Sequence, residues 1–217
     1  NQPMLILDDV LRLFPDAANV FVVMGSGELG QFWRREFERE AGRLSSQLRI
    51  ELSYGMSYAQ ILQRASTLPP HSAVYFHSLD VDAQGTTYST ERVLTDLHAR
   101  ANAPLFGAQS AEFGRGVIGG MMMSTDTASE RAADAALQIL AGTSPALIKM
   151  PVQQAGPSVF DWRELQRWGV NEARLPPGSE VRFRGPSLWR DYRREMFGVV
   201  GALLVQAFLI VGLLYQR

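Results

Sequence analysis

A glycine-rich stretch, Gly25-Ser-Gly27-Glu-Leu-Gly30, follows the apolar run 20–24 and precedes an amphipathic segment. Three glycines at this spacing between a strand and a helix are typical of a loop that holds the pyrophosphate of a dinucleotide on a helix amino terminus. Glu51 stands about twenty residues further on, where such sites carry an acidic residue for the ribose. The motif raises the hypothesis of a nucleotide-dependent enzyme.

Two carboxylates argue against this hypothesis. Glu28 lies inside the loop, where its charge would repel a pyrophosphate. Glu51 is followed by three more residues before the turn at Gly55, so it belongs to the body of an alternating strand and not to its tip. We interpret the first two glycines as a tight turn and the third as a close helix–strand contact, and we expect no cofactor. The nucleotide-dependent enzyme stays as the less favoured alternative.

The elements around the loop alternate in type. Apolar residues at helical spacing, separated by short apolar or alternating runs, predict βαβ units. We expect an α/β fold whose parallel sheet has helices on both faces. The expected helices are 5–14, 29–44, 58–68, 90–101 and 129–140, and the expected strands are 20–24, 48–52, 72–78, 104–108, 119–124 and, as a half-exposed edge strand, 180–184.

Polar and glycine residues follow four of the predicted strands. In an open α/β sheet, ligands bind outside the carboxyl ends of the strands, so these loops would face one cleft. They offer backbone N–H, hydroxyl, amide and carboxylate groups but no recognisable catalytic set. We therefore expect a small-molecule solute as ligand, with these candidate binding residues: Gly25, Ser26, Tyr54, Ser78, Asp80, Gln109, Ser110 and Phe113.

Composition excludes several classes of function. Among 217 residues, 21 Lys and Arg oppose 22 Asp and Glu, which leaves a formal net charge of −1 and no basic field for nucleic acid. The chain has no cysteine, and its histidines, His71, His77 and His98, do not have the spacing of metal ligands. We expect no metal site and interpret each histidine as an ordinary surface or strand residue.

The tail carries the strongest physical signal. Residues 196–215 contain no charged residue and one amide, and as a helix they would span about 30 Å, the thickness of one bilayer core. We predict a transmembrane helix there, so the lipid bilayer is an expected partner. Gly198 and Ala202, four residues apart, would let two such helices approach closely in a homodimer. The chain does not begin with Met and shows no signal peptide, and we interpret it as a segment of a longer protein.

A short pattern occurs twice: Leu68-Pro-Pro-His-Ser72 and Leu175-Pro-Pro-Gly-Ser179. No longer similarity surrounds the two copies, so we interpret them as the same proline turn used twice and not as a repeat.

The stretch from Phe160-Asp-Trp-Arg to Tyr192-Arg, leading directly into the apolar tail, resembles a known family. It is similar to the membrane junction of bacterial sensor histidine kinases whose extracytoplasmic domain is like an ABC-transporter substrate-binding protein of the class I periplasmic-binding-protein fold. Weaker similarity extends upstream through Leu68-Pro-Pro70, Pro104-Leu-Phe-Gly107 and Gly116-Val-Ile-Gly-Gly120. The resemblance thus covers nearly the whole chain.

This resemblance implies a division of the chain. Residues 1–113 would form the second lobe of a solute-binding domain, and 114–185 would return to and complete the first lobe. Residues 186–195 would form a juxtamembrane helix and 196–215 the span. No histidine phosphoacceptor or ATP-binding motif appears, so the kinase domain would lie beyond Arg217. The binding domain would be periplasmic at the bacterial inner membrane, although the arginines before the span favour the opposite orientation.

The resulting hypothesis is a ligand-sensing domain and membrane span of a two-component sensor histidine kinase. The alternative is a membrane-tethered substrate-binding protein of an ABC transporter.

Overall fold

The computed structural model describes residues 2–44, 48–148, 157–185, 197 and 206. A first compact unit ends at Phe183, and a second begins at Arg184. Within the described residues, the first unit contains every strand and every helix. Only the single helical residues Phe197 and Gln206 lie in the second unit. Its helices are α1 (Gln2–Leu13), α2 (Glu28–Leu44), α3 (Tyr58–Ser66), α4 (Thr90–Arg100), α5 (Thr125–Leu140) and α6 (Trp162–Arg167). Its strands are β1 (Asn19–Val23), β2 (Arg49–Leu52), β3 (Ser72–Phe76), β4 (Leu105–Gly107), β5 (Gly119–Gly120), β6 (Val159–Asp161) and β7 (Glu180–Arg182).

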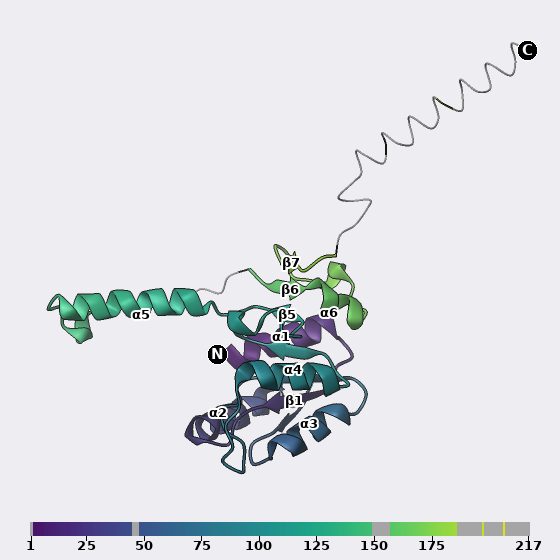
Figure 1. Cartoon of the computed structure of the whole chain (residues 1–217), viewed down its shortest axis with the longest axis horizontal. Helices are drawn as coiled ribbons and strands as arrows, with labels where there is room; N and C mark the ends of the chain where they lie inside the picture. The colour runs from purple at the N-terminus through teal and green to yellow at the C-terminus, as the bar shows by residue number, and fades with distance from the viewer. Residues whose placement is uncertain (1, 45–47, 149–156, 186–196, 198–205, 207–217) are drawn as a thin grey trace, which may run out of the picture. The chain divides into compact units, whose positions relative to one another are not determined.

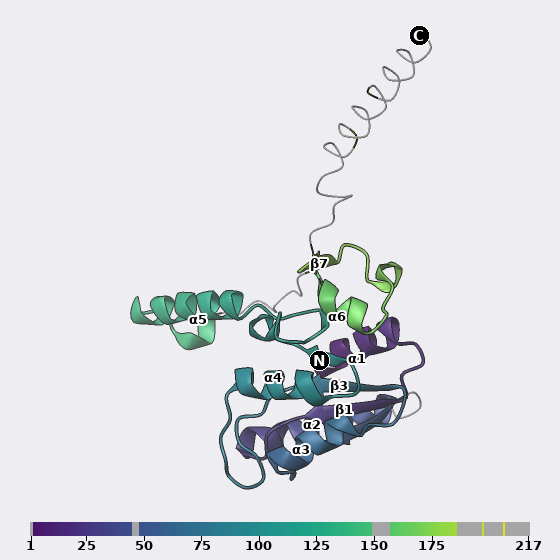
Figure 2. The same ribbon diagram turned by 45° about the vertical axis from the view of Figure 1, so that its right-hand side comes forward.

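A four-stranded parallel sheet in the order β2-β1-β3-β4 forms the centre of this unit. Figures 1 and 2 show helices on both sides of these strands. Val20 and Val22 of β1 belong to a buried cluster with α1 and α2, whereas Phe21 and Val23 belong to a second cluster with α3 and α4. The expected α/β fold with a parallel sheet covered on both faces is confirmed.

The second sheet has three strands in the order β5-β6-β7. β5 pairs antiparallel to β6, and β7 pairs parallel to β6 at the edge, as its alternating pattern predicted. The expected strand 119–124 is shorter than predicted and ends at Gly120. Met121 leaves the strand because its N–H donates to the buried Asp9 carboxylate of α1 at 3.0 Å.

Residues 157–183 pack onto the main sheet. Phe160 of β6 and Leu165 of α6 are fully buried in the cluster that contains α1 and β1. His98 Nε2 of α4 lies 2.8 Å from the buried Glu164 carboxylate of α6. The Arg174 guanidinium donates to the Leu13 carbonyl oxygen of α1 at 3.2 Å. This segment is therefore part of the same folded body as the sheet.

The predicted juxtamembrane helix 186–195 and the predicted span 196–215 fall outside the described residues, apart from Phe197 and Gln206. In the described part of the chain, no helix combines the length and the apolar character that crossing a membrane requires. The division into two lobes at 113/114 stays a prediction.

We expect Phe160→Ala to lower the free energy of unfolding by about 3–5 kcal/mol, because it opens a cavity where the 157–183 segment meets the sheet. Leu140→Ala is the control at an exposed position, since the Leu140 side chain is 83% exposed, and it should cost about 1 kcal/mol or less. Urea unfolding followed by circular dichroism measures both. Equal losses in the two variants would mean that Phe160 does not join this segment to the core.

Candidate functional site: the carboxyl-end edge of the sheet

The four parallel strands end at one edge of the sheet, and hydrogen bonds join the loops that follow three of them. The Ser53 hydroxyl, after β2, accepts from the Met24 N–H at 2.8 Å and donates to the Met24 carbonyl oxygen at 2.9 Å. The Gly55 N–H donates to Ser26 Oγ at 3.0 Å, and the Ser26 N–H donates to the Val81 carbonyl oxygen at 2.8 Å. The loops after β1, β2 and β3 thus form one continuous rim, which brings together loops that the sequence predicted to converge.

The glycine loop after β1 carries a carboxylate on its surface. A Cβ atom built on Gly25 would lie 2.1 Å from Asp80 Oδ1, and one on Gly30 would lie 1.9 Å from the Gly25 carbonyl oxygen. Glycine is required at both positions because other groups approach the backbone closely. Asp80 and Glu28 both place negative charge beside this loop, which opposes binding of a pyrophosphate. The geometry favours the interpretation of the glycines as a tight, closely packed turn.

A pocket of about 290 Å³ lies between the ends of β3 and β4 and the start of α4. Ser78 and Gln109, two of the predicted binding residues, line it together with His77, Glu112 and Arg115. The Arg115 guanidinium is paired with the Glu91 carboxylate at 2.7 Å, and Glu91 also lines the pocket. The pocket therefore presents both a cationic and an anionic group to solvent.

His77 joins this pocket to an aromatic surface. Its ring centroid lies 4.5 Å from that of Trp33 and 5.5 Å from that of Phe37, both on α2. Burial lowers the pKa of His77 to about 4, so the imidazole is neutral at pH 7. Phe32, in edge contact with Trp33, is 50% exposed.

Glu112 forms the floor of the pocket. Its side chain is buried and accepts the Gln109 N–H at 3.1 Å. Burial raises the pKa of Glu112 to about 7, because a charged carboxylate is disfavoured in an apolar environment. A carboxyl group with this pKa is partly protonated at neutral pH.

The remaining predicted residues occupy different places along the edge. Gly25, Ser26 and Asp80 belong to the rim, and the Tyr54 ring lies 4.9 Å below the Arg34 guanidinium. The Ser110 N–H donates to the Met123 carbonyl oxygen at 2.9 Å, and the ring centroid of Phe113 lies 5.3 Å from that of Phe183. Neither residue lines the pocket.

Sequence reasoning missed His77, Glu112 and Arg115. The predicted strand extended to Ser78, whereas β3 ends at Phe76 and leaves His77 as the first residue of the loop. Glu112 and Arg115 lie next to predicted binding residues, which was the available signal. The burial of Glu112 and the ion pair of Arg115 with Glu91 depend on residues distant in sequence.

Solved structures that are similar to this chain include the following three. A conserved domain protein from Vibrio cholerae O1 biovar El Tor strain N16961 matches with a TM-score of 0.60 and 17% identity over 81% of this chain and 58% of that one. An ABC domain in complex with L-Trp from Streptococcus pneumoniae matches with a TM-score of 0.63 and 17% identity over 84% and 62%. A substrate-binding protein with adhesive properties from Clostridium difficile, in a ligand-free, open structure, matches with a TM-score of 0.54 and 15% identity over 82% and 58%.

These similarities show a substrate-binding-protein-like fold, as the sequence resemblance implied. The chain spans between 58% and 62% of the length of those structures. Neither a protein-family model nor a curated protein sequence matches it.

We expect Ser53→Ala to lower the free energy of unfolding by about 1–3 kcal/mol, because it leaves the N–H and carbonyl of buried Met24 without their hydrogen bonds to the hydroxyl. Ser66→Ala, at an exposed position of α3, should change it by about 0.5 kcal/mol or less. Urea unfolding of both variants measures the difference. A Ser53 variant as stable as the Ser66 variant would show that the rim does not depend on this hydroxyl.

Glu112 should make stability fall with rising pH. Because burial raises its pKa to about 7 from an ordinary 4.5, the folded state binds more protons than the unfolded state between these values. The free energy of unfolding therefore decreases as pH rises through this window. Glu112→Gln removes this dependence, so the variant should gain roughly 3 kcal/mol over the native protein between about pH 4.5 and pH 8.

The measurement is urea unfolding of both proteins across that pH range. The opposite slope from His77, whose pKa is lowered, is common to both proteins and cancels in the difference. If the difference in free energy of unfolding between the variant and the native protein does not change with pH, the pKa of Glu112 is not raised by burial.

Proposed function

We propose that this chain supplies a small-solute-binding domain of the substrate-binding-protein type, with the ligand seated at the carboxyl-end edge of the main sheet. The observation that carries the proposal is a pocket at that edge of the fold, lined by the residues that follow β3 and β4 and by the start of α4, with the paired charges of Arg115 and Glu91 at its surface. Buried pockets with a few convergent polar groups are the usual form of a ligand site.

The ligand class follows from the groups at the pocket. Arg115 offers a guanidinium, the group best suited to hold a carboxylate in a two-point contact. Glu91 offers an acceptor for an ammonium group, and Trp33, in ring contact with His77 of the lining, offers aromatic surface beside the pocket. These groups fit an amino acid with an apolar or aromatic side chain. The Streptococcus pneumoniae neighbour, which is bound to L-Trp, supports this class.

The rest of the protein would complete the cleft. The similar structures are longer than this chain, and the apolar side chains of Leu137 and Leu140 on α5 are 64% and 83% exposed. We propose that α5 packs against a first lobe formed largely by residues outside this chain. The ligand would then bind between the two lobes and favour the closed state through its higher affinity for it.

Two membrane contexts suit such a domain. The resemblance over residues 160–192 supports a periplasmic sensor of a two-component histidine kinase, anchored by 196–215 as a homodimer at the inner membrane. The neighbours, an ABC domain and a substrate-binding protein, support a tethered component of an ABC transporter at least as well. The coding sequence after Arg217 separates the two: a phosphoacceptor histidine and an ATP-binding domain support the sensor, and a stop codon supports the tether.

The ligand is tested by titrating L-tryptophan, L-leucine and L-glutamate into the ¹⁵N-labelled full chain in a mild detergent. We expect saturable shifts of the Trp33 indole N–H resonance with the apolar amino acids, at ligand concentrations up to about 10 mM. Arg115→Gln should weaken this binding at least about tenfold, which corresponds to the loss of a charged contact to the ligand carboxylate.

Arg182→Gln is the matched control. Arg182 forms a comparable ion pair with Glu180 at 2.8 Å but lies on β7, outside the pocket. Binding that is equally weakened in both variants, or no response of Trp33 to any amino acid, would refute the proposed ligand class.

A further inference from the structure

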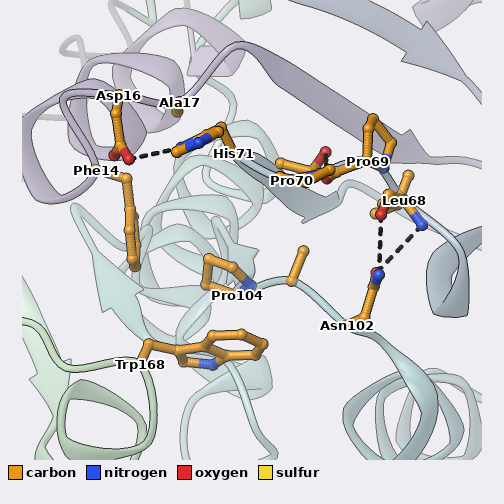
Figure 3. A pocket seen from close by; sticks show the side chains of 12 residues that line it. Phe14, Asp16, Ala17, Leu68, Pro69, Pro70, His71, Asn102, Pro104 and Trp168 are labelled. Atoms are coloured by element: carbon orange, nitrogen blue, oxygen red, sulfur yellow. Dashed lines mark hydrogen bonds and ion pairs between the residues drawn. The ribbon is translucent and has the colours of Figure 1, made fainter.

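A second pocket, of about 330 Å³, opens at the opposite edge of the main sheet (Figure 3). Its lining comes from the segments just before β1, β3 and β4, and from Trp168, which follows α6. The carboxyl-end pocket shares no lining residue with it. It is therefore separate from the site proposed above and does not depend on that proposal.

The walls of this pocket are apolar and its charge is concentrated at one end. Phe14, Pro70, Pro104 and Trp168 supply the apolar surface, and Figure 3 shows Trp168 and Pro104 opposite the Asp16 and His71 side chains. The His71 Nδ1 atom lies 2.6 Å from the Asp16 carboxylate.

The other polar end of the pocket is already occupied by protein contacts. The Asn102 side chain accepts the Leu68 N–H at 3.2 Å and donates to the Leu68 carbonyl oxygen at 2.9 Å. No lysine or arginine is among the lining residues. Asp16 and His71 contact each other but are 68% and 55% exposed, so a ligand can reach both, and the Asp16 carboxylate favours a cation over an anion.

The turn that carries His71 can be compared with a second turn of the same chain. The Leu68-Pro-Pro-His-Ser72 and Leu175-Pro-Pro-Gly-Ser179 segments adopt the same turn. Ser72 Oγ donates to the Pro69 carbonyl oxygen at 2.6 Å, and Ser179 Oγ donates to the Pro176 carbonyl oxygen at 2.7 Å. The fourth residue of each turn has a positive φ, 60° at His71 and 79° at Gly178.

Glycine is the residue that this backbone conformation favours, and it occupies the position in the second copy. Histidine in the first copy is held in a strained conformation although the turn does not require a side chain there. Strained residues that persist in this way cluster at functional sites. The side chain of His71, which reaches Asp16 at the pocket, is the part that glycine could not supply.

We propose that this pocket is a second binding site, for a small aromatic amine. The ring of the ligand packs against Phe14, Pro70 and Trp168, and its ammonium group binds the Asp16 carboxylate beside the His71 imidazole. An imidazole can donate or accept at its second ring nitrogen, which suits a polar substituent of the ring. Because Trp168 belongs to the segment 157–183, an occupied pocket would hold this segment against the strand ends.

The test is a titration of 2-phenylethylamine into the ¹⁵N-labelled full chain in a mild detergent, with phenylacetate as the control that has the same ring and an anionic tail. The indole N–H resonances of Trp168 and Trp33, assigned with Trp168→Phe and Trp33→Phe, report the two edges of the sheet separately. We expect a saturable shift of the Trp168 resonance with the amine at up to about 10 mM, no such shift with phenylacetate, and no change at Trp33.

Two variants decide whether the shift comes from the proposed contacts. His71→Gly copies the second turn, so its melting temperature should stay within about 3 °C of the native value or rise, while binding of the amine weakens at least about tenfold. Asp16→Asn, at an exposed position, should weaken it to a similar extent. Asp8→Asn, an exposed carboxylate of α1 outside the pocket, should leave it unchanged.

No saturable shift at Trp168, or equal affinity in the native protein and both pocket variants, would overturn the proposal. A response confined to Trp33 would also overturn it, because the amine would then bind at the carboxyl-end edge. Failure of the amino-acid titration at Trp33 concerns the proposed function alone and leaves this test intact.

Discussion

Burial of both faces of β1 is the constraint on which the rest of this structure depends. Val20 and Val22 face one buried cluster and Phe21 and Val23 face the other, so neither side of the strand can contact solvent. A strand of this kind requires helices on both sides and partners on both edges, which β2 and β3 supply in parallel. Parallel pairing places the carboxyl ends of the strands together, and the rim of loops at that edge follows from it.

The sequence was sufficient for the main elements because their signal is local. A period of two or of 3.6 residues is set by neighbouring residues, so β1 and the helices that flank it could be predicted closely. β5 shows the limit of that reasoning. The run 119–124 has the apolar character of a strand, but the N–H of Met121 binds Asp9, 112 residues away. No local pattern contains that contact.

The same limit applies to the carboxyl-end site. Polar residues next to strand ends could be identified, and Ser78 and Gln109 do line the pocket. The pKa shifts of His77 and Glu112 could not be predicted. They arise from burial, which depends on how the elements pack together. Burial among the rings of α2 lowers the pKa of His77 to about 4, and burial against Gly107 of β4 raises the pKa of Glu112 to about 7. The carboxylate of Asp80 likewise reaches the glycine loop across more than fifty residues of sequence, which the spacing of the glycines could not indicate.

The buried Glu164 carboxylate links residues 157–183 to α4. One of its oxygens lies 2.8 Å from His98 Nε2, and the other has no hydrogen-bond partner within the described residues. Separating α6 from α4 would remove the His98 contact and leave the carboxylate with only its ion pair to Arg167, whose guanidinium lies 3.7 Å from the second oxygen, and loss of a contact to a buried charge costs more than an exposed ion pair contributes. Arg167 adds a second link by donating to the His98 carbonyl oxygen at 3.2 Å. Residues 157–183 are therefore joined to α4 by two contacts at His98. The start of the same helix lines the carboxyl-end pocket, so α4 connects that pocket with the last part of this unit.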